Sequence, residues 1–262
     1  MTFSLTWLPD VLRQVGLKVA EVPGWESRGR GDMGRVLGVV CHHTVGPKTG
    51  NMPSLNLITK GSKKLSGPLS QLGLGRDGTF YVVAAGRANH AGGGVWRRQM
   101  DGNGNFIGIE AENMGTKADF PWPNVQMDAC RRGVAAILAH VGQPAEMCCG
   151  HREFALPAGR KIDPLFDMAE FRESVGATIA GTLPAPTLIP AIDSQSRQTI
   201  RRGSTGVLVE EVQSRLAISP TGPFGPRTEA AVRMLQREHG LVPDGIVGPK
   251  TWKIIDTLIE IP

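Results

Sequence analysis

Two histidine-bearing segments and one carboxylate are the residues best suited to hold a metal ion. One segment is an apolar strand that ends in His42 and His43, and the other is the run G-H-R-E-F-A-L-P-A-G-R-K-I-D-P, which contains His151 and Asp163. Two imidazoles and a carboxylate can give a tetrahedral zinc ion three protein ligands and leave its fourth position open for water. Such a water can attack a carbonyl carbon near neutral pH. The residues therefore predict a metal-assisted hydrolase.

The residue types alone do not decide whether His42 or His43 is the metal ligand. Successive side chains of a strand point to opposite faces, so only one of the two can share the site unless the strand bulges. Cys149, two residues before His151, is a further candidate ligand. A buried structural thiol is the more common state of a cysteine, and it is the reading that we favour for Cys149.

Strands and helices alternate through the first 180 residues. Apolar runs predict buried strands, and apolar positions spaced three and four apart predict helices. The expected strands are residues 36–41, 80–84 and 106–110, and the expected helices are residues 8–16, 125–141 and 167–175. This order predicts an α/β domain with one central mixed β-sheet flanked by helices.

A segment rich in Pro, Ser and Thr, residues 181–198, is the expected linker between a first domain at 1–180 and a second at 199–262. The second domain contains a repeat, since G-P-F-G-P-R-T and G-I-V-G-P-K-T begin 23 residues apart. Each copy reads as a tight turn followed by a helix, with Pro early and Thr as a cap. We expect a small three-helix unit that binds rather than catalyses.

Composition excludes several classes of protein. The net charge of +5 is modest and scattered, and aromatic residues make up 5% of the chain, which argues against a nucleic-acid-binding protein. No apolar run is long enough to cross a membrane, and the first residues do not resemble a secretory signal. The four cysteines form no C-x-x-C pair, which argues against a zinc ribbon and favours free thiols in a reducing compartment.

Several motifs together resemble the zinc-dependent N-acetylmuramoyl-L-alanine amidases of the type 2 class, which share their fold with peptidoglycan recognition proteins. The order and spacing of the motifs carry the resemblance over nearly the whole first domain. The motifs are V-V-C-H-H-T (39–44), G-R-D-G-T (75–79), A-N-H-A-G (88–92), N-F-I-G-I-E (105–110), G-H (150–151) and D-P (163–164). The stretch G-P-L-S-Q-L-G-L-G-R-D-G, residues 67–78, is similar to endolysins of phages that infect actinobacteria.

The resemblance implies a role for each matching residue. The zinc ligands of the family fall on His42, His151 and Asp163, its catalytic glutamate on Glu110, and its catalytic lysine on Lys161. Glu110 is suited to accept the proton of the attacking water and to deliver it to the leaving amine. Lys161 is suited to stabilise the oxyanion.

This chain departs from the family at two places. The separation of 12 residues between His151 and Asp163 is about two longer than in some relatives, and we expect a local bulge at residues 156–158. Many relatives carry Tyr or His before the R-D-G turn, where this chain has Ser70 and Gln71. A tyrosine-assisted mechanism is therefore not expected, and Tyr81, the one tyrosine, is expected to pack.

Two further residues are candidates for the substrate groove. His90, in A-N-H-A-G, is expected to line it, with Asn105 nearby. The alternative for His90 is a histidine that holds a loop by hydrogen bonds, and the sequence gives the two readings equal weight.

The second domain resembles a three-helix peptidoglycan-binding module with the signature D-G-x-[FV]-G-x-x-T. Asp244, Gly245 and Trp252 belong to the copy that matches it, whereas the first copy has Thr221 in place of the aspartate. A separate binding module raises the local concentration of an enzyme on an insoluble substrate.

These resemblances imply a monomeric phage endolysin that uses Zn²⁺ to cleave the amide between N-acetylmuramic acid and L-alanine. Its expected partner is bacterial peptidoglycan, with no nucleic acid or membrane involved. It is expected in the host cytoplasm before lysis and then at the cell wall. The alternatives are a non-catalytic peptidoglycan recognition protein, which the filled ligand positions disfavour, and a cytoplasmic amidase that recycles muropeptides, which the binding module disfavours.

Overall fold

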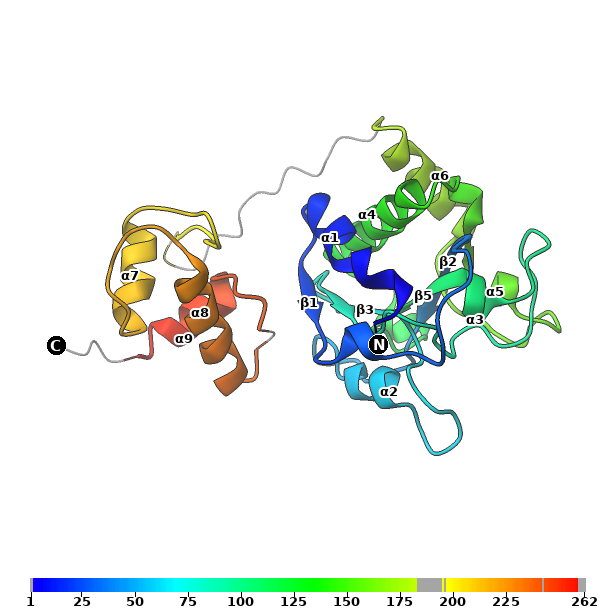
Figure 1. Ribbon diagram of the computed structural model, residues 1–262, viewed down its shortest axis with the longest axis horizontal. Coiled ribbons are helices and arrows are strands. Elements are labelled where there is room, and N and C mark those ends of the chain that lie inside the picture. The colour runs from blue at the N-terminus through cyan, green and yellow to red at the C-terminus, as the bar shows by residue number, and fades with distance from the viewer. Residues whose placement is uncertain (1, 183–194, 196, 242, 259–262) are drawn as a thin grey trace. The chain divides into compact units, whose positions relative to one another are not determined.

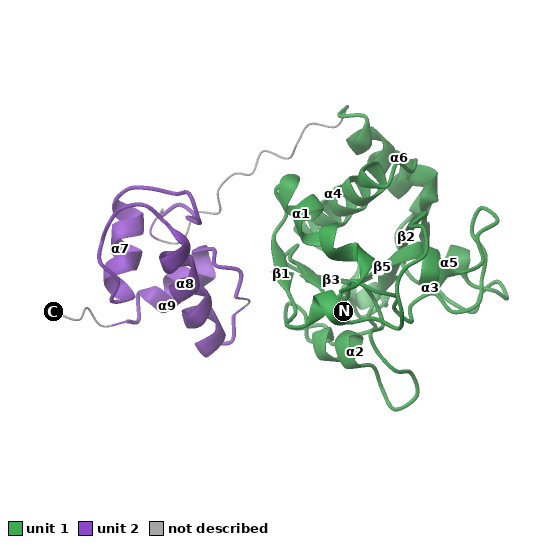
Figure 2. Cartoon of the chain, viewed as in Figure 1, with its two compact units in different colours: residues 1–183 green, residues 184–262 purple. Residues whose placement is uncertain are grey.

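The chain forms two compact units, residues 1–183 and 184–262, each of which is described by itself (Figure 2). The computed structural model describes residues 2–182, 195, 197–241 and 243–258. Most of the expected linker, residues 181–198, lies outside the described residues. No helix in the described ranges is both long and apolar enough to cross a membrane.

A six-stranded sheet forms the centre of the first unit, in the order β1-β4-β3-β5-β2-β6 (Figure 1). The strands are β1 (Val19–Glu21), β2 (Gly38–His43), β3 (Leu72–Leu74), β4 (Phe80–Val82), β5 (Phe106–Ala111) and β6 (Cys148–Gly150). The pairing of β3 with β4 is antiparallel and all the others are parallel. The sheet is therefore mixed, which confirms the predicted fold class.

Helices cover this sheet and confirm the three that the apolar spacing predicted. The helices are α1 (Leu8–Gln14), α2 (Leu55–Lys60), α3 (Gly102–Asn105), α4 (Asn124–His140), α5 (His151–Phe154) and α6 (Met168–Ile179), with short 3₁₀ turns at Ser4–Trp7, Trp25–Ser27, Lys117–Asp119 and Ala145–Met147. Figure 1 shows α1, α4 and α6 grouped together, and α4 contacts both of the others. The face of α4 that carries Cys130, Val134 and Ile137 is buried in the main core. Each large apolar side chain buried in this way contributes about 1.5–3 kcal/mol.

The alternation of side chains along β2 divides the sheet into two faces. Val39 and Cys41 belong to the main core under the helices, whereas Val40 belongs to a small apolar cluster on the opposite face. His42 follows the same alternation and lies on the face of Val40. The strand thus uses one face for packing and presents its histidine on the other.

The second unit has a core of its own around three helices in its described part. The helices are α7 (Val207–Arg215), α8 (Pro226–Glu238) and α9 (Pro249–Ile255). Their apolar faces bury Val209, Val212, Val232 and Trp252 with no accessible surface. This confirms the predicted small helical domain.

A buried glutamine closes each copy of the internal repeat, Gln213 in the first and Gln236 in the second. The side-chain oxygen of each accepts a hydrogen bond from the first glycine N–H of its loop motif, and the amide nitrogen donates to the threonine hydroxyl of the same motif. Thr221 and Asp244 occupy equivalent places, since each accepts a bond from its glutamine. The first loop therefore keeps its geometry despite the missing aspartate.

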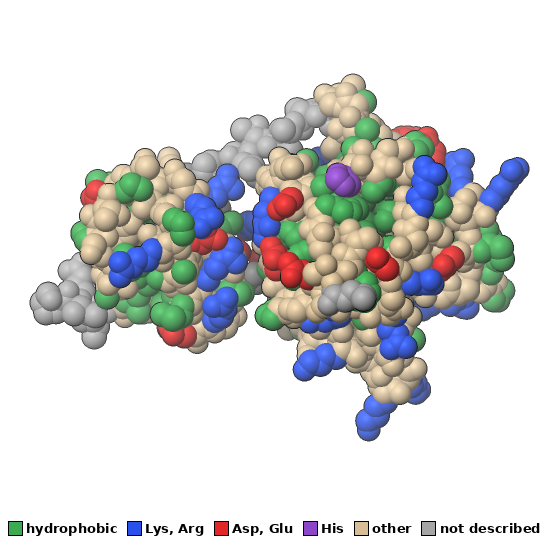
Figure 3. Space-filling model, in the orientation of Figure 1, with side chains coloured by type: hydrophobic (Ala, Val, Ile, Leu, Met, Phe, Trp, Pro, Cys, Tyr) green, Lys and Arg blue, Asp and Glu red, His purple; other side chains and the backbone are tan. Residues whose placement is uncertain are grey.

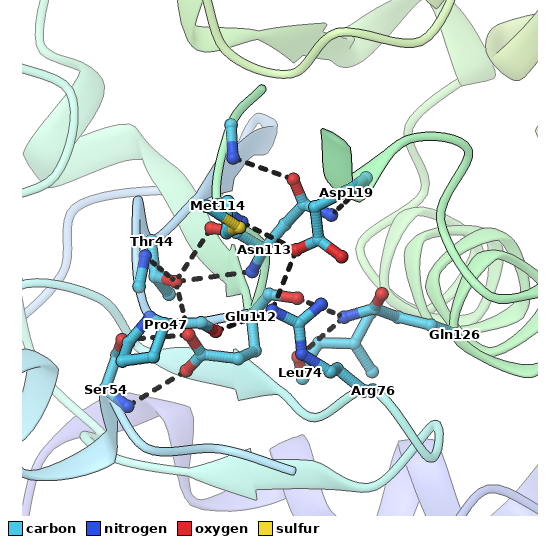
Figure 4. Close-up of polar contacts among 12 residues, drawn as sticks. Thr44, Pro47, Ser54, Leu74, Arg76, Glu112, Asn113, Met114, Asp119 and Gln126 are labelled. Carbon is cyan, nitrogen blue, oxygen red and sulfur yellow. Dashed lines mark hydrogen bonds and ion pairs between the residues drawn. The ribbon is translucent and has the colours of Figure 1, made fainter. Parts of the chain in front are cut away.

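Glu112, just beyond β5, ties the loop that follows β2 to the sheet (Figure 4). It is completely buried, and its carboxylate accepts hydrogen bonds from Thr44 Oγ1 (2.9 Å), Ser54 N (2.9 Å) and Ser54 Oγ (3.0 Å). Gly46 must be glycine because a Cβ there would lie 1.9 Å from the same carboxylate. Gln126 of α4 donates to the carbonyl oxygen of Glu112 and adds the helix to this network.

We predict that Glu112→Ala lowers the free energy of unfolding of the first unit by at least about 2 kcal/mol, because buried donors are left without an acceptor. Chemical denaturation followed by far-UV circular dichroism measures the change. Glu173→Ala, at an exposed position of α6, is the matched control and is expected to change stability little. Equal stability of the Glu112→Ala protein and the control would show that the network does not hold the loop.

Candidate metal centre

Parallel pairing brings the predicted ligands to one edge of the sheet. β2 lies between β5 and β6, with His42 in register with Glu110 and Cys41 in register with Gly150. His151 is the next residue after Gly150 and begins α5. Because parallel strands end at the same edge, the side chains that follow β2 and β6 meet there.

Asp163 reaches the same place through a turn. Its backbone carbonyl accepts a hydrogen bond from Arg152 N (2.7 Å), which holds the segment against α5. The Arg160 N–H donates to the Pro157 carbonyl and closes a turn at residues 157–160, which overlaps the segment 156–158 where a bulge is expected. Asp163 lies beside both histidines.

The three predicted ligands form a nearly equilateral triangle of atoms. His42 Nδ1 and His151 Nδ1 are 3.0 Å apart, and Asp163 Oδ2 lies 3.3 Å from the first and 3.1 Å from the second. All three residues are buried. Zinc bonds of about 2.0–2.1 Å at tetrahedral angles would place ligand atoms about 3.3–3.4 Å apart, so the triangle is close to the size that such an ion needs.

The protonation of this group also fits a cation. Burial lowers the pKa of His42 to about 4, so its ring is neutral at pH 7. Burial alone would raise the pKa of Asp163, but His151 and His42 outweigh it and hold that pKa below its usual range. A cation between these atoms would take up a lone pair from each imidazole nitrogen and pair with the charge of the carboxylate. The His42, His151 and Asp163 group can therefore hold a metal ion, and its donor set suits zinc.

Glu110 lies next to this group and has an unusual environment. Its Oε2 is buried and has no hydrogen-bond partner among the described residues. Burial, assisted by the negative charge of Asp163 and opposed by Lys161, raises the pKa of Glu110 to about 8. A divalent cation at the triangle would lower this pKa toward neutrality, the range in which a carboxyl group serves best as both base and acid.

Lys161 is partly exposed and lies two residues before Asp163. The positive charge of Lys161 acts on the site electrostatically, because it contributes to lowering the pKa of both Glu110 and His42. The structure thus brings the predicted lysine near the predicted ligands and glutamate.

The remaining predicted site residues lie as follows. His90 is buried, with Nδ1 3.1 Å from His42 Nε2, so its ring borders a predicted ligand. Asn105, at the end of α3, donates to the Arg35 carbonyl. Trp252 is buried in the core of the second unit, and Asp244 and Gly245 belong to its second loop.

His43 and Cys149 lie outside the metal-binding group. His43 is buried against Gly115, where a Cβ would lie 2.4 Å from its ring. Cys149 belongs to the small apolar cluster around Val40 and Phe106. Among the described residues, the candidate metal group contains neither of them.

Ser70 and Gln71 are completely buried and serve the backbone of β5. Ser70 Oγ donates to the Gly108 carbonyl (2.8 Å), and the Gln71 side-chain oxygen accepts from the Gly108 N–H (2.7 Å). Tyr81 is also buried, and its hydroxyl accepts a bond from Asn51. The sequence did not predict the contacts of Gln71, Glu112 and Asn103, because their hydrogen-bond partners lie at least 12 residues away. The available signal was a polar side chain within an apolar or glycine-rich run.

We predict that Glu110→Gln stabilises the metal-free protein at alkaline pH. The pKa of Glu110 in the folded state, about 8, lies above its ordinary value of 4.5, so its favourable contribution is complete below pH 4.5 and is lost as the pH rises through 8. Glutamine does not ionise. The difference in Tm between variant and wild type should therefore move in favour of the variant as the pH rises from about 4.5 to about 8, and should stay constant above that. A difference that is constant with pH would contradict the raised pKa.

Solved structures similar to the chain include AmpD and the amidase AmiD. A selenomethionine derivative of AmpD is 22% identical with a TM-score of 0.48, over 66% of this chain and 99% of that one. The amidase AmiD from E. coli, in complex with anhydro-N-acetylmuramic acid-L-Ala-D-γ-Glu-L-Lys, is 20% identical with a TM-score of 0.45, over 89% of this chain and 92% of that one.

Two curated proteins share shorter regions. An uncharacterised protein from Kitasatospora aureofaciens is 37% identical over 91 residues, 31% of this chain and 77% of that protein. The zinc D-Ala-D-Ala carboxypeptidase of Streptomyces albus G is 42% identical over 65 residues, 22% of this chain and 26% of that protein.

Family profiles match both units. The peptidoglycan-binding domain profile matches residues 205–255. The N-acetylmuramoyl-L-alanine amidase profile matches residues 32–165, half of the chain, and this range includes every residue of the candidate metal centre. The chain therefore belongs to the N-acetylmuramoyl-L-alanine amidase family and carries a peptidoglycan-binding domain after its amidase domain.

Proposed function

We propose that this amidase is a zinc enzyme that cleaves the bond between N-acetylmuramic acid and L-alanine in intact peptidoglycan, and that it lyses the host cell wall for a phage. The observation that carries the proposal is the buried triangle of His42, His151 and Asp163 atoms beside the unpartnered carboxylate oxygen of Glu110. This arrangement has the donors for a zinc ion and a proton-transfer group within one small site.

His42, His151 and Asp163 would hold the ion, which, when bound, would acidify a water molecule and polarise the amide carbonyl. Glu110 accepts the proton of the attacking water and delivers it to the leaving amine of L-alanine. Lys161 places its positive charge where the carbonyl oxygen becomes negative. The raised pKa of Glu110 suits it to both halves of this transfer, because it gains and loses a proton near neutral pH.

The second unit supports action on the insoluble wall. We propose an amidase domain at residues 1–180, a linker at 181–198 and a wall-binding domain at 199–262 that includes Asp244, Gly245 and Trp252. Tethering to the polymer raises the concentration of the amidase at its substrate without any new contact at the catalytic site. A muropeptide-recycling amidase acts on dissolved fragments and gains nothing from such a domain. The presence of the domain therefore favours lysis over recycling.

The surface charge is compatible with an anionic polymer. Lys and Arg side chains are scattered over the face seen in Figure 3 and are interspersed with Asp and Glu, in keeping with the net charge of +5. A modest positive charge of this kind attracts an acidic wall polymer and is weakened by salt.

Digestion of purified peptidoglycan should release new N-terminal alanine and no new reducing sugar ends. Chelation should abolish the product, and one equivalent of Zn²⁺ should restore it. We expect Glu110→Gln to lower kcat by about 100-fold or more, because it removes the proton-transfer group. Glu173→Gln, at an exposed site on α6, is the control and should retain activity. New reducing ends would identify a glycosidase, and activity that survives chelation would exclude the metal mechanism.

Removal of the second unit should distinguish an enzyme that lyses intact walls from one that recycles soluble muropeptides. A chain of residues 1–183, which has its own core, should cleave a soluble muropeptide as fast as the full chain. It should act on intact walls at least about tenfold more slowly, because the gain from tethering is lost. Equal rates on intact walls for both chains would favour the recycling enzyme.

A further inference from the structure

A chain of hydrogen bonds runs from His42 away from the metal triangle. His42 Nε2 lies 3.1 Å from His90 Nδ1, and His90 Nε2 lies 3.1 Å from the backbone carbonyl oxygen of Phe106. Both rings are buried, so no solvent competes for these bonds. The strand β5 thus connects to the ligand on β2 through one imidazole.

The carbonyl at the far end determines the direction of every bond in this chain. A carbonyl oxygen only accepts, so His90 Nε2 carries the proton and donates to Phe106. In a neutral His90 ring, Nδ1 is then an acceptor, and the bond from His42 must come from a proton on His42 Nε2. The Nδ1 atom of His42 is left with a free lone pair, and it is the atom that lies in the triangle.

His151 is oriented in the same way by the adjacent residue. Its Nε2 lies 3.1 Å from the Ala91 carbonyl oxygen, which fixes the proton on Nε2 and leaves Nδ1 as the free lone pair. His90 and Ala91 are consecutive, so one short segment contacts both imidazoles on the side opposite to the triangle.

Two features hold that segment in place. The Asn103 side-chain oxygen accepts hydrogen bonds from His90 N (3.0 Å) and Ala91 N (2.8 Å), so a single residue of α3 fixes both. Gly108 of β5 provides the space for the imidazole, because a Cβ there would lie 2.6 Å from the His90 ring. The segment is therefore supported by a side chain and seated against the sheet.

We propose that His90 and Ala91, held by Asn103, are positioning residues that keep both histidine ligands in the tautomer and orientation that direct Nδ1 at the metal. The inference rests on the proposed metal function and adds to it the residues that prepare the site. In this proposal His90 acts on the ligand His42, through the hydrogen bond to His42 Nε2. Partners of this kind typically contribute about 10- to 100-fold to metal affinity.

Zinc affinity tests the proposal without reference to catalysis. Competition with a chromophoric chelator gives the Kd for Zn²⁺ of the full-length wild type and of each variant. His90→Phe keeps a planar ring and removes both hydrogen bonds, and Asn103→Ala removes the support of the segment. Each should raise the Kd by about 10- to 100-fold. Asn103→Asp keeps an acceptor oxygen and should stay within about threefold of wild type.

Controls separate positioning from general damage. His140→Phe replaces a histidine that lies against Trp7 at the end of α4, and it should leave the Kd unchanged. Far-UV circular dichroism of the metal-free proteins shows whether each variant is folded. If His90→Phe does not fold, the comparison of Asn103→Ala with Asn103→Asp decides the matter.

Nitrogen NMR of the zinc-loaded wild type provides a direct readout. His42, His90 and His151 should each show a protonated Nε2, which a merely structural role for His90 does not require. A proton on Nδ1 of His90, or unchanged zinc affinity in folded His90→Phe and Asn103→Ala proteins, would overturn the inference. Absence of zinc binding by the wild type would instead overturn the metal function itself.

Discussion

The parallel pairing of β2 with both β5 and β6 is the constraint on which the site depends. It places the end of β2 between a strand that carries Glu110 and a strand that leads into His151. Segments separated by more than 100 residues in the sequence thereby reach one edge of the sheet. A slip of one residue in β2 would turn His42 into the helix-covered core and Cys41 toward the site.

The two faces of β2 meet different physical demands. The face with Val39 and Cys41 buries apolar surface under the helices and provides stability. The face with His42 buries polar groups, which is costly unless each is paired. The hydrogen bonds through His90 and Ala91 satisfy the outer nitrogens of the histidines, while the inner nitrogens remain free for a cation.

The second unit also buries polar side chains whose hydrogen bonds are satisfied. Each loop of the repeat is held by a glutamine from the helix before it, and both glutamines make equivalent bonds to a glycine and a threonine. Repetition of one buried polar contact lets a small core specify two loops. In the amidase domain, Glu112 holds the loop after β2 through hydrogen bonds to Thr44 and Ser54 that are not repeated elsewhere in the described residues.

The sequence by itself determined the α/β class, the helical second unit and the residue types that gather at the site. The spacing of apolar residues indicates which face of a helix or strand is buried, and the histidine and aspartate motifs indicate a set of metal ligands. Strand alternation left His42 and His43 open, and the family resemblance implied His42. The tertiary structure places His42 against His151, because the register between strands depends on contacts that neither strand's sequence specifies. It also decided the places of His90 and Asn103, since a hydrogen bond between distant segments leaves no local pattern in the sequence.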